Sequence, residues 1–303
     1  MNTETFGYPT GYAPHIRAHR DTSTLGMLYS LSMMPLWIAS TYRHGLIGFL
    51  LPTLAVLIFA GVEMLFSFFL FGKDKKFDYF SVATGLGVAT VLPVTLPLPI
   101  FFFVVIVSAL LGRQLLHRKF LWILPIPMIA RMVIAYLYPS LFAFPAGDSI
   151  LGSMTAQGFS TMGGDCIASI ALSYIFLVSV RWERLRTAIL FFLFSLGSSI
   201  ILTLLPLPVS LFGDFSRTEY FLQSGVVFYG FILLTDMRNL PVSILGQWIY
   251  SMIAAGSAIL LWVLGWGQLS VPMAALGLSC LYTLIQLPFI RIRIKSRTYR
   301  RKT

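Results

Sequence analysis

The centre of the chain reads Ala146-Gly-Asp-Ser-Ile-Leu-Gly-Ser-Met-Thr-Ala-Gln-Gly-Phe-Ser-Thr-Met-Gly-Gly-Asp165, the longest polar and glycine-rich stretch in a sequence of 303 residues. It carries two aspartates and several hydroxyl side chains but no lysine or arginine. Before it and after it, one apolar segment follows another. We therefore expect the fold to consist of two groups of apolar segments, one on each side of this stretch.

The composition excludes an ordinary soluble domain. Hydrophobic residues make up 57% of the chain and charged residues only 11%, whereas a soluble domain carries about a quarter charged residues. The net charge of +11 comes from short basic clusters between apolar runs, a pattern that is typical of membrane loops and not of nucleic-acid binding. The two cysteines, Cys166 and Cys280, are too far apart in sequence to suggest a metal site or a disulfide framework.

Ten apolar segments are long enough to be membrane spans. A span needs roughly 20 apolar residues to cross the hydrocarbon core. By that measure the sequence predicts an all-α polytopic membrane protein with spans at 25–42, 45–71, 79–95, 98–116, 121–144, 164–181, 185–206, 218–236, 242–264 and 270–290.

The basic residues alternate between the two sides of this predicted topology. Lysine and arginine clusters precede the first span and follow the second, fourth, sixth, eighth and tenth, and only Arg43 and Arg217 lie in the other loops. Because basic loops are retained in the cytoplasm, we predict that both termini, 1–24 and 291–303, are cytoplasmic. The central stretch is then on the outer face, and the basic tail from 291 to 303 is expected to meet anionic lipid headgroups or a partner subunit.

Five spans lie on each side of the central loop, 146–163. With an odd number per half, the amino-terminal half (25–145) and the carboxy-terminal half (164–290) are inverted relative to each other if they are related, which is typical of proteins with a site near the bilayer midplane. A short match supports the relation: Asp78-Tyr-Phe-Ser-Val-Ala-Thr-Gly85 opens the third span and Glu219-Tyr-Phe-Leu-Gln-Ser-Gly225 opens the eighth. The match is short, and chance is the alternative explanation.

The third span is unusual because the segment from Ala83 to Pro99 contains two glycines, three threonines and three prolines. Glycine allows close approach of a backbone or a flat ligand, and proline frees a helix carbonyl. Thr84, Gly85 and Gly87 are therefore candidate cofactor contacts. The alternative is tight helix packing through small residues.

The ionisable residues of interest inside predicted spans are Glu63 in the second, Arg131 in the fifth and Asp236 at the inner end of the eighth. Charges within the bilayer are costly, so each is a candidate for ion coupling. Counted from the cytoplasmic ends of their spans, Glu63 and Arg131 lie at similar depths, roughly 12 and 14 Å, and we hypothesise that they pair. Such a pair serves either as a static lock between helices or as part of an ion or proton pathway.

Six features form a pattern along the chain: His19-Arg-Asp-Thr-Ser23, Met27 to Pro35, Glu63 in the second span, Ala83 to Pro99, Arg181-Trp182 and Phe231-Ile-Leu-Leu-Thr-Asp236. Together they resemble the RnfD/NqrB family, the membrane flavoprotein subunits of ion-translocating electron transport complexes. The segment from Ala83 to Pro99 is the most specific match. The resemblance covers most of the chain and implies the same fold of ten spans in two inverted halves.

The resemblance also gives the central loop a function. Members of the family carry FMN on the outer face, joined through its phosphate to the last threonine of a D-x-x-[ST]-x-A-T motif by an ApbE-type flavin transferase. Asp148 to Thr155 has the leading aspartate and the final threonine, although the spacing is one residue longer and Met154 replaces the alanine. The resemblance therefore implies covalent FMN on Thr155, with Thr161 as the second candidate.

Other positions depart from the family pattern. The glycine-rich loop between the fourth and fifth helices is replaced by Leu115 to Pro127, which leaves open a second, noncovalent flavin. Asp236 is followed by Met237 and Arg238 instead of proline, and Arg131 has no counterpart in the pattern. The sequence resembles a divergent member of the family.

The resemblance predicts an electron-transfer subunit in a prokaryotic cytoplasmic (inner) membrane, working with other membrane subunits and not catalytic alone. Because no nucleotide-binding motif is present, oxidation of NADH or ferredoxin is expected on partner subunits. The alternative is a small-solute transporter or channel without a redox cofactor, because inverted halves with broken helices also suit alternating access.

Overall fold

The computed structural model describes residues 22–71, 77, 79–117, 125–142, 167–180, 183–204, 221, 225–234 and 244–279. Within these ranges the regular structure is entirely helical, as predicted. Three described helical segments have the length and apolar composition to cross a membrane: Gly26–Phe66, Leu185–Leu204 and Ile244–Ser279. Four shorter apolar helices accompany them: Phe80–Val91, Leu98–Gly112, Ile126–Leu137 and Ala168–Ser179.

Helix α1 (Thr22–Phe71) contains two of the predicted spans and reverses at Gly45. This glycine has φ 62° and ψ −138°, a conformation that side chains with a Cβ rarely adopt. The Trp37 and Phe49 rings stack at 5.4 Å, whereas residues twelve apart in a continuous helix are separated by about 18 Å. The chain therefore folds back on itself, between the predicted spans 25–42 and 45–71.

The amino-terminal half continues with α2 (Phe80–Val91), α3 (Leu98–His117) and α4 (Ile126–Leu137), followed by the short turn η1 (Pro139–Phe142). Helix α2 is almost wholly buried and packs against α1, α3 and α4. Its start is fixed by α1, where the Ser30 hydroxyl donates to the Tyr79 carbonyl at 3.2 Å. At about 18 Å, α2 is too short to cross the roughly 30 Å hydrocarbon core alone.

The carboxy-terminal half begins with α6 (Ile167–Val180) and α7 (Glu183–Leu204). A short helix, α10 (Val226–Phe228), leads into the π-helical η3 (Tyr229–Leu233), and α11 (Ile244–Leu261) leads into the π-helical η4 (Trp262–Trp266) and the 3-10 turn η5 (Gly267–Leu269). Residues 270–279 are helical again. The Ser251 hydroxyl joins α11 to α7 by donating to the Thr187 carbonyl at 3.2 Å.

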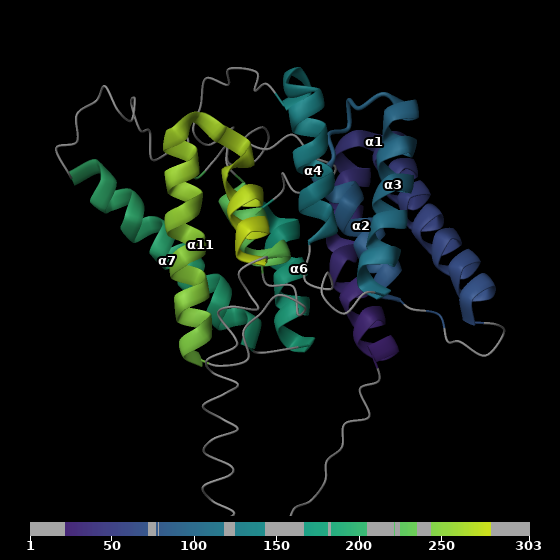
Figure 1. Ribbon diagram of the computed structural model, residues 1–303, viewed down its shortest axis with the longest axis horizontal. Coiled ribbons are helices and arrows are strands. Elements are labelled where there is room, and N and C mark those ends of the chain that lie inside the picture. The colour runs from purple at the N-terminus through teal and green to yellow at the C-terminus, as the bar shows by residue number, and fades with distance from the viewer. Residues whose placement is uncertain are drawn as a thin grey trace, which may run out of the picture.

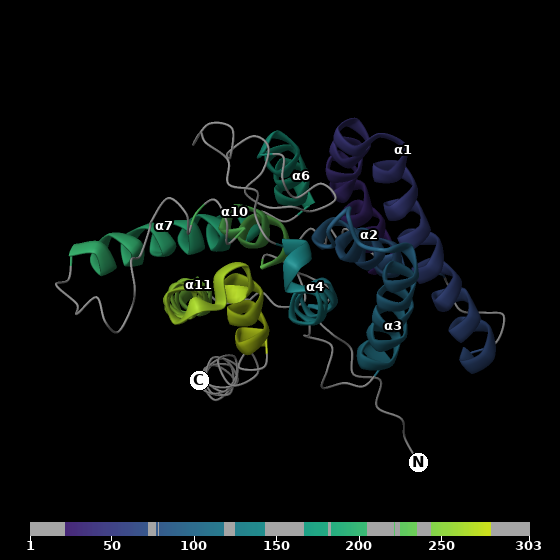
Figure 2. The same ribbon diagram turned by 90° about the horizontal axis from the view of Figure 1, so that it is seen from above.

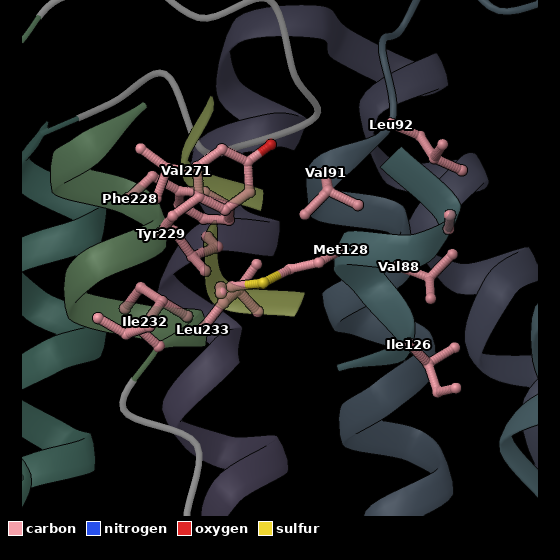
Figure 3. Packing of buried hydrophobic residues seen from close by; sticks show 14 of the residues in the cluster. Val88, Val91, Leu92, Ile126, Met128, Phe228, Tyr229, Ile232, Leu233 and Val271 are labelled. Atoms are coloured by element: carbon pink, nitrogen blue, oxygen red, sulfur yellow. The ribbon is translucent and has the colours of Figure 1, made fainter. Parts of the chain in front are cut away.

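The two halves lie side by side. In Figures 1 and 2, α1 to α3 form one group while α7 and α11 form the other, with α4 and α6 between them. Helix α1 packs against α6, so the first helices of the two halves meet. One hydrophobic core runs through both halves, and Figure 3 shows Val91 of α2 facing Tyr229 of η3 while Met128 of α4 reaches toward Leu233.

Helical residues occur within each of the ten predicted spans, and several of the predicted bounds differ from those observed. Helix α2 stops at Val91, earlier than the predicted end at 95, because Leu92 precedes Pro93 and is extended. The predicted spans 242–264 and 270–290 are joined by η4 and η5 into one helical segment as far as Ser279. The number of membrane crossings, the inverted relation of the halves and the sides of the termini stay predictions, and 1–21, 146–163 and 291–303 lie outside the described residues.

Candidate functional site

Arg131, in the middle of α4, is fully buried and donates hydrogen bonds to both halves of the chain. Its Nη1 donates to the carbonyl of Val91 in α2 at 3.0 Å. Its Nη2 donates to Oε1 of Gln268 in η5 at 2.8 Å. We call these three residues the Arg131 junction.

The acceptor on α2 exists because that helix is broken. In a continuous helix the Val91 carbonyl would accept from the N–H of Thr95, but Leu92 is extended and Pro93 follows. The last carbonyls of a helix need partners from outside it, and they carry the negative end of the helix dipole. The guanidinium of Arg131 therefore caps α2 with a positive charge.

The acceptor in the carboxy-terminal half is presented by a glycine turn. Gly265 has φ 87° and Gly267 has φ 49°, and both lie where the π-helical η4 gives way to η5. A Cβ at either position would meet no atom within 4 Å, so each glycine is required by its backbone conformation and not by crowding. The turn aims the Gln268 side chain at the guanidinium.

A third irregular segment borders the junction. Tyr229, the first residue of η3, is fully buried, and its phenol lies within electrostatic range of Arg131. Gly230, next to it, allows η3 to approach α7 so closely that a Cβ there would lie 2.6 Å from Phe191 Cδ1. π-helical turns are frequent at functional sites, and irregular backbone at membrane depth occurs where protein or a cavity surrounds it. The broken backbone of both halves thus converges around one buried charge.

Glu63 lies in the second arm of α1, the part that follows Gly45, and the residue is buried, with a relative solvent exposure of 4%. Two contacts of α2 fix its register and show that Glu63 and Arg131 are far apart along this helix. Gly85 of α2 faces Ala55 and Phe59 of α1. The Val91 carbonyl, six residues later in α2, accepts from Arg131. Gly85 to Val91 rises about 9 Å toward one end of α2, and Phe59 to Glu63 runs about 6 Å toward the other. The pair of Glu63 with Arg131 stays a prediction, which this register does not favour.

Thr84, Gly85 and Gly87 serve the packing of α2. The Thr84 hydroxyl donates to the Phe80 carbonyl one turn back, at 2.7 Å. A Cβ on Gly85 would lie 3.2 Å from the Ala55 carbonyl oxygen, and one on Gly87 would lie 3.0 Å from Pro127 Cγ. Protein atoms fill the space that a flat ligand would use, so these residues do not fit a flavin in this structure and the packing alternative is favoured.

The other predicted site residues, Asp148, Thr155, Thr161 and Asp236, lie outside the described residues. Within the described ranges, no group of three or more histidine, cysteine, aspartate or glutamate side chains is placed to hold a metal ion.

Sequence reasoning identified Arg131 but missed Gln268 and Tyr229. Gln268 falls between two predicted spans, where a polar residue is expected and attracts no attention. The usable signal was the pair of glycines flanking Trp266, directly before the glutamine. Tyr229 carried no signal, because a tyrosine in an apolar span is ordinary.

Residues 10–294 match the model of the family described as NQR2, RnfD, RnfE. No curated protein matches the chain.

Proposed function

The chain belongs to the NQR2, RnfD, RnfE family, and we propose that it is an electron-transfer subunit of an ion-translocating oxidoreductase complex in a prokaryotic cytoplasmic membrane. The observation that carries this proposal is the extent of the family match, residues 10–294 of 303. Members of this family are linked to such complexes as membrane subunits, and the apolar helices of this chain suit the same role.

The proposed cofactor is FMN, held covalently through its phosphate on Thr155 or, failing that, on Thr161. Both hydroxyls lie in the central loop, where the charge pattern predicts exposure on the outer face. Asp148 opens the motif that an ApbE-type flavin transferase would recognise. Bound FMN supplies the redox chemistry that amino-acid side chains lack, while the protein supplies position and electrostatics.

Ion coupling is assigned to the carboxylates Glu63 and Asp236. A charged carboxylate buried in a membrane helix is energetically costly, so it is stabilised by binding a proton or a cation. Such residues therefore mark ion pathways. Glu63 meets this condition through its burial on α1. Oxidation of the electron donor is assigned to partner subunits, since the sequence contains no nucleotide-binding motif.

The covalent flavin is tested by coexpressing the chain with a flavin transferase and viewing the denatured band under ultraviolet light. We expect a fluorescent band for the wild type and for Thr161→Ala, and a dark band for Thr155→Ala. Fluorescence lost only in Thr161→Ala moves the attachment to that residue. A dark wild-type band, with a known flavinylated protein bright in the same cells, contradicts the covalent cofactor.

A further inference from the structure

The Arg131 junction has the composition of a cation site whose cation is part of the protein. We propose that the guanidinium of Arg131 is a tethered cation, which occupies the broken end of α2 in place of a free monovalent ion and so closes this position to the ion that the complex moves.

The acceptors are of the right kind for a metal cation. In transporters with discontinuous helices, unwound carbonyls and the carboxyl ends of half-helices coordinate Na⁺. The junction has a carbonyl at the carboxyl end of a half-helix, Val91, and a neutral amide oxygen, Gln268 Oε1. Both oxygens accept from Arg131 at 3.0 and 2.8 Å.

The acceptors are held in place independently of the arginine. Pro93 and the extended Leu92 end α2 at Val91, and the positive φ values of Gly265 and Gly267 set the turn before Gln268. Val91 itself, together with Tyr229 and Val271, belongs to the buried core. Removing the guanidinium would therefore leave both oxygens facing the space that it now fills.

The positive charge of Arg131 excludes a second cation from the junction. The guanidinium stays protonated in proteins, and its two acceptors in the junction are neutral. A second cation at the same point would meet an unscreened like charge in a buried setting. Ion movement in this chain is thereby directed away from the junction, and carboxylates such as Glu63 are the remaining candidates.

The inference needs the buried junction and not the flavin, so it stands or falls separately from the covalent cofactor. The test compares the melting temperature of purified Arg131→Ala with that of the wild type, in NaCl and in N-methylglucamine chloride at equal ionic strength. We expect Arg131→Ala to melt a few degrees higher in Na⁺ than in the organic cation, because Na⁺ binding to the folded state stabilises it. We expect no comparable difference for the wild type.

A second substitution assigns the Na⁺ effect to the junction. Adding Gln268→Leu to Arg131→Ala removes one oxygen, and we expect the extra Na⁺ stabilisation to be lost. If Arg131→Ala shows no larger Na⁺ dependence than the wild type, or if the effect survives Gln268→Leu unchanged, the proposal is overturned.

A matched pair of variants covers the case in which Arg131→Ala does not fold. Arg131→Lys keeps a tethered cation, and Arg131→Met keeps similar bulk without charge. A higher melting temperature for the lysine variant than for the methionine variant supports the tethered cation. Equal losses in both variants would show that packing, and not charge, is what the site requires, and would overturn the proposal.

Discussion

The two halves of the molecule interrupt their helices in different ways at the same place. In the amino-terminal half, α2 is stopped by Pro93 and leaves a carbonyl without a helical donor. In the carboxy-terminal half, the segment from η4 to η5 is turned by two glycines and offers a side-chain amide. A proline stop creates an acceptor in the backbone, whereas a glycine turn only aims an acceptor that a side chain supplies. The acceptor at the proline stop should therefore persist when the Val91 side chain is changed, whereas the acceptor at the glycine turn is lost when the Gln268 side chain is changed.

The largest effect is expected from Arg131→Met, which removes the donor that both interruptions share. Two hydrogen bonds to a charged group are lost, at roughly 1.5–3 kcal/mol each, so we expect a loss of about 3–6 kcal/mol in the free energy of unfolding. Thermal unfolding followed by tryptophan fluorescence measures it. A melting temperature within a degree of the wild type would mean that the two interruptions do not depend on each other.

Gln268→Leu should separate the two sides of the junction. It removes the acceptor of the carboxy-terminal half and keeps the bond from Arg131 to the Val91 carbonyl. We expect a loss of roughly 1.5–3 kcal/mol. Because the two residues share one hydrogen bond, the double variant with Arg131→Met should lose less than the sum of the single variants. Strict additivity would count against the junction.

Gly265→Ala tests the glycine turn itself. The backbone conformation at φ 87° is strained for a residue with a Cβ, so we expect a loss of about 1–2 kcal/mol. Gly61→Ala in α1 is the matched control, because neither site has an atom within 4 Å of the added Cβ and only Gly265 has a positive φ. The control should be neutral or slightly stabilising. Equal losses at the two sites would rule out the backbone explanation.

Gly87→Ala tests a glycine of the other kind, in the body of α2. Its new Cβ would lie 3.0 Å from Pro127 Cγ, while alanine gains about 1 kcal/mol of helix propensity over glycine. The two effects oppose each other, and we expect the variant to stay within about 1 kcal/mol of the wild type. A larger loss of stability than that of Gly265→Ala would show that steric contact with Pro127 costs more than the strained backbone conformation at Gly265.

The smallest effect expected is the coupling between Glu63→Gln and Arg131→Met. The register of α2 places the two residues at different depths, so their effects on stability should add within about 0.5 kcal/mol. A double-mutant cycle of unfolding measures the coupling. A coupling energy above about 1 kcal/mol would restore the predicted pair and place Glu63 at the junction.

Features that depend on neighbours in sequence were predictable. The reversal between the first two spans and the burial of Arg131 follow from residue types at adjacent positions. The stop of α2 at Val91 follows from Pro93 in the same way, although the span was predicted to run to 95. The partners of Arg131 were not predictable, because Gln268 is 137 residues away in sequence and its selection depends on how the halves pack. The predicted pairing of Glu63 with Arg131 was based only on their similar depths in the membrane. Depth gives no information on the register between α1, α2 and α4.

The reversal of α1 at Gly45 bears on how the protein enters the membrane. Its two arms are joined by a single residue with non-helical backbone angles, and Trp37 donates through Nε1 to the Phe49 carbonyl across the bend at 3.3 Å. The polar residues beside the bend that have to be carried across the bilayer are few, chiefly Arg43 and His44. If both arms cross the bilayer as predicted, we expect them to insert together as one hairpin, against which α2, α3 and α6 pack.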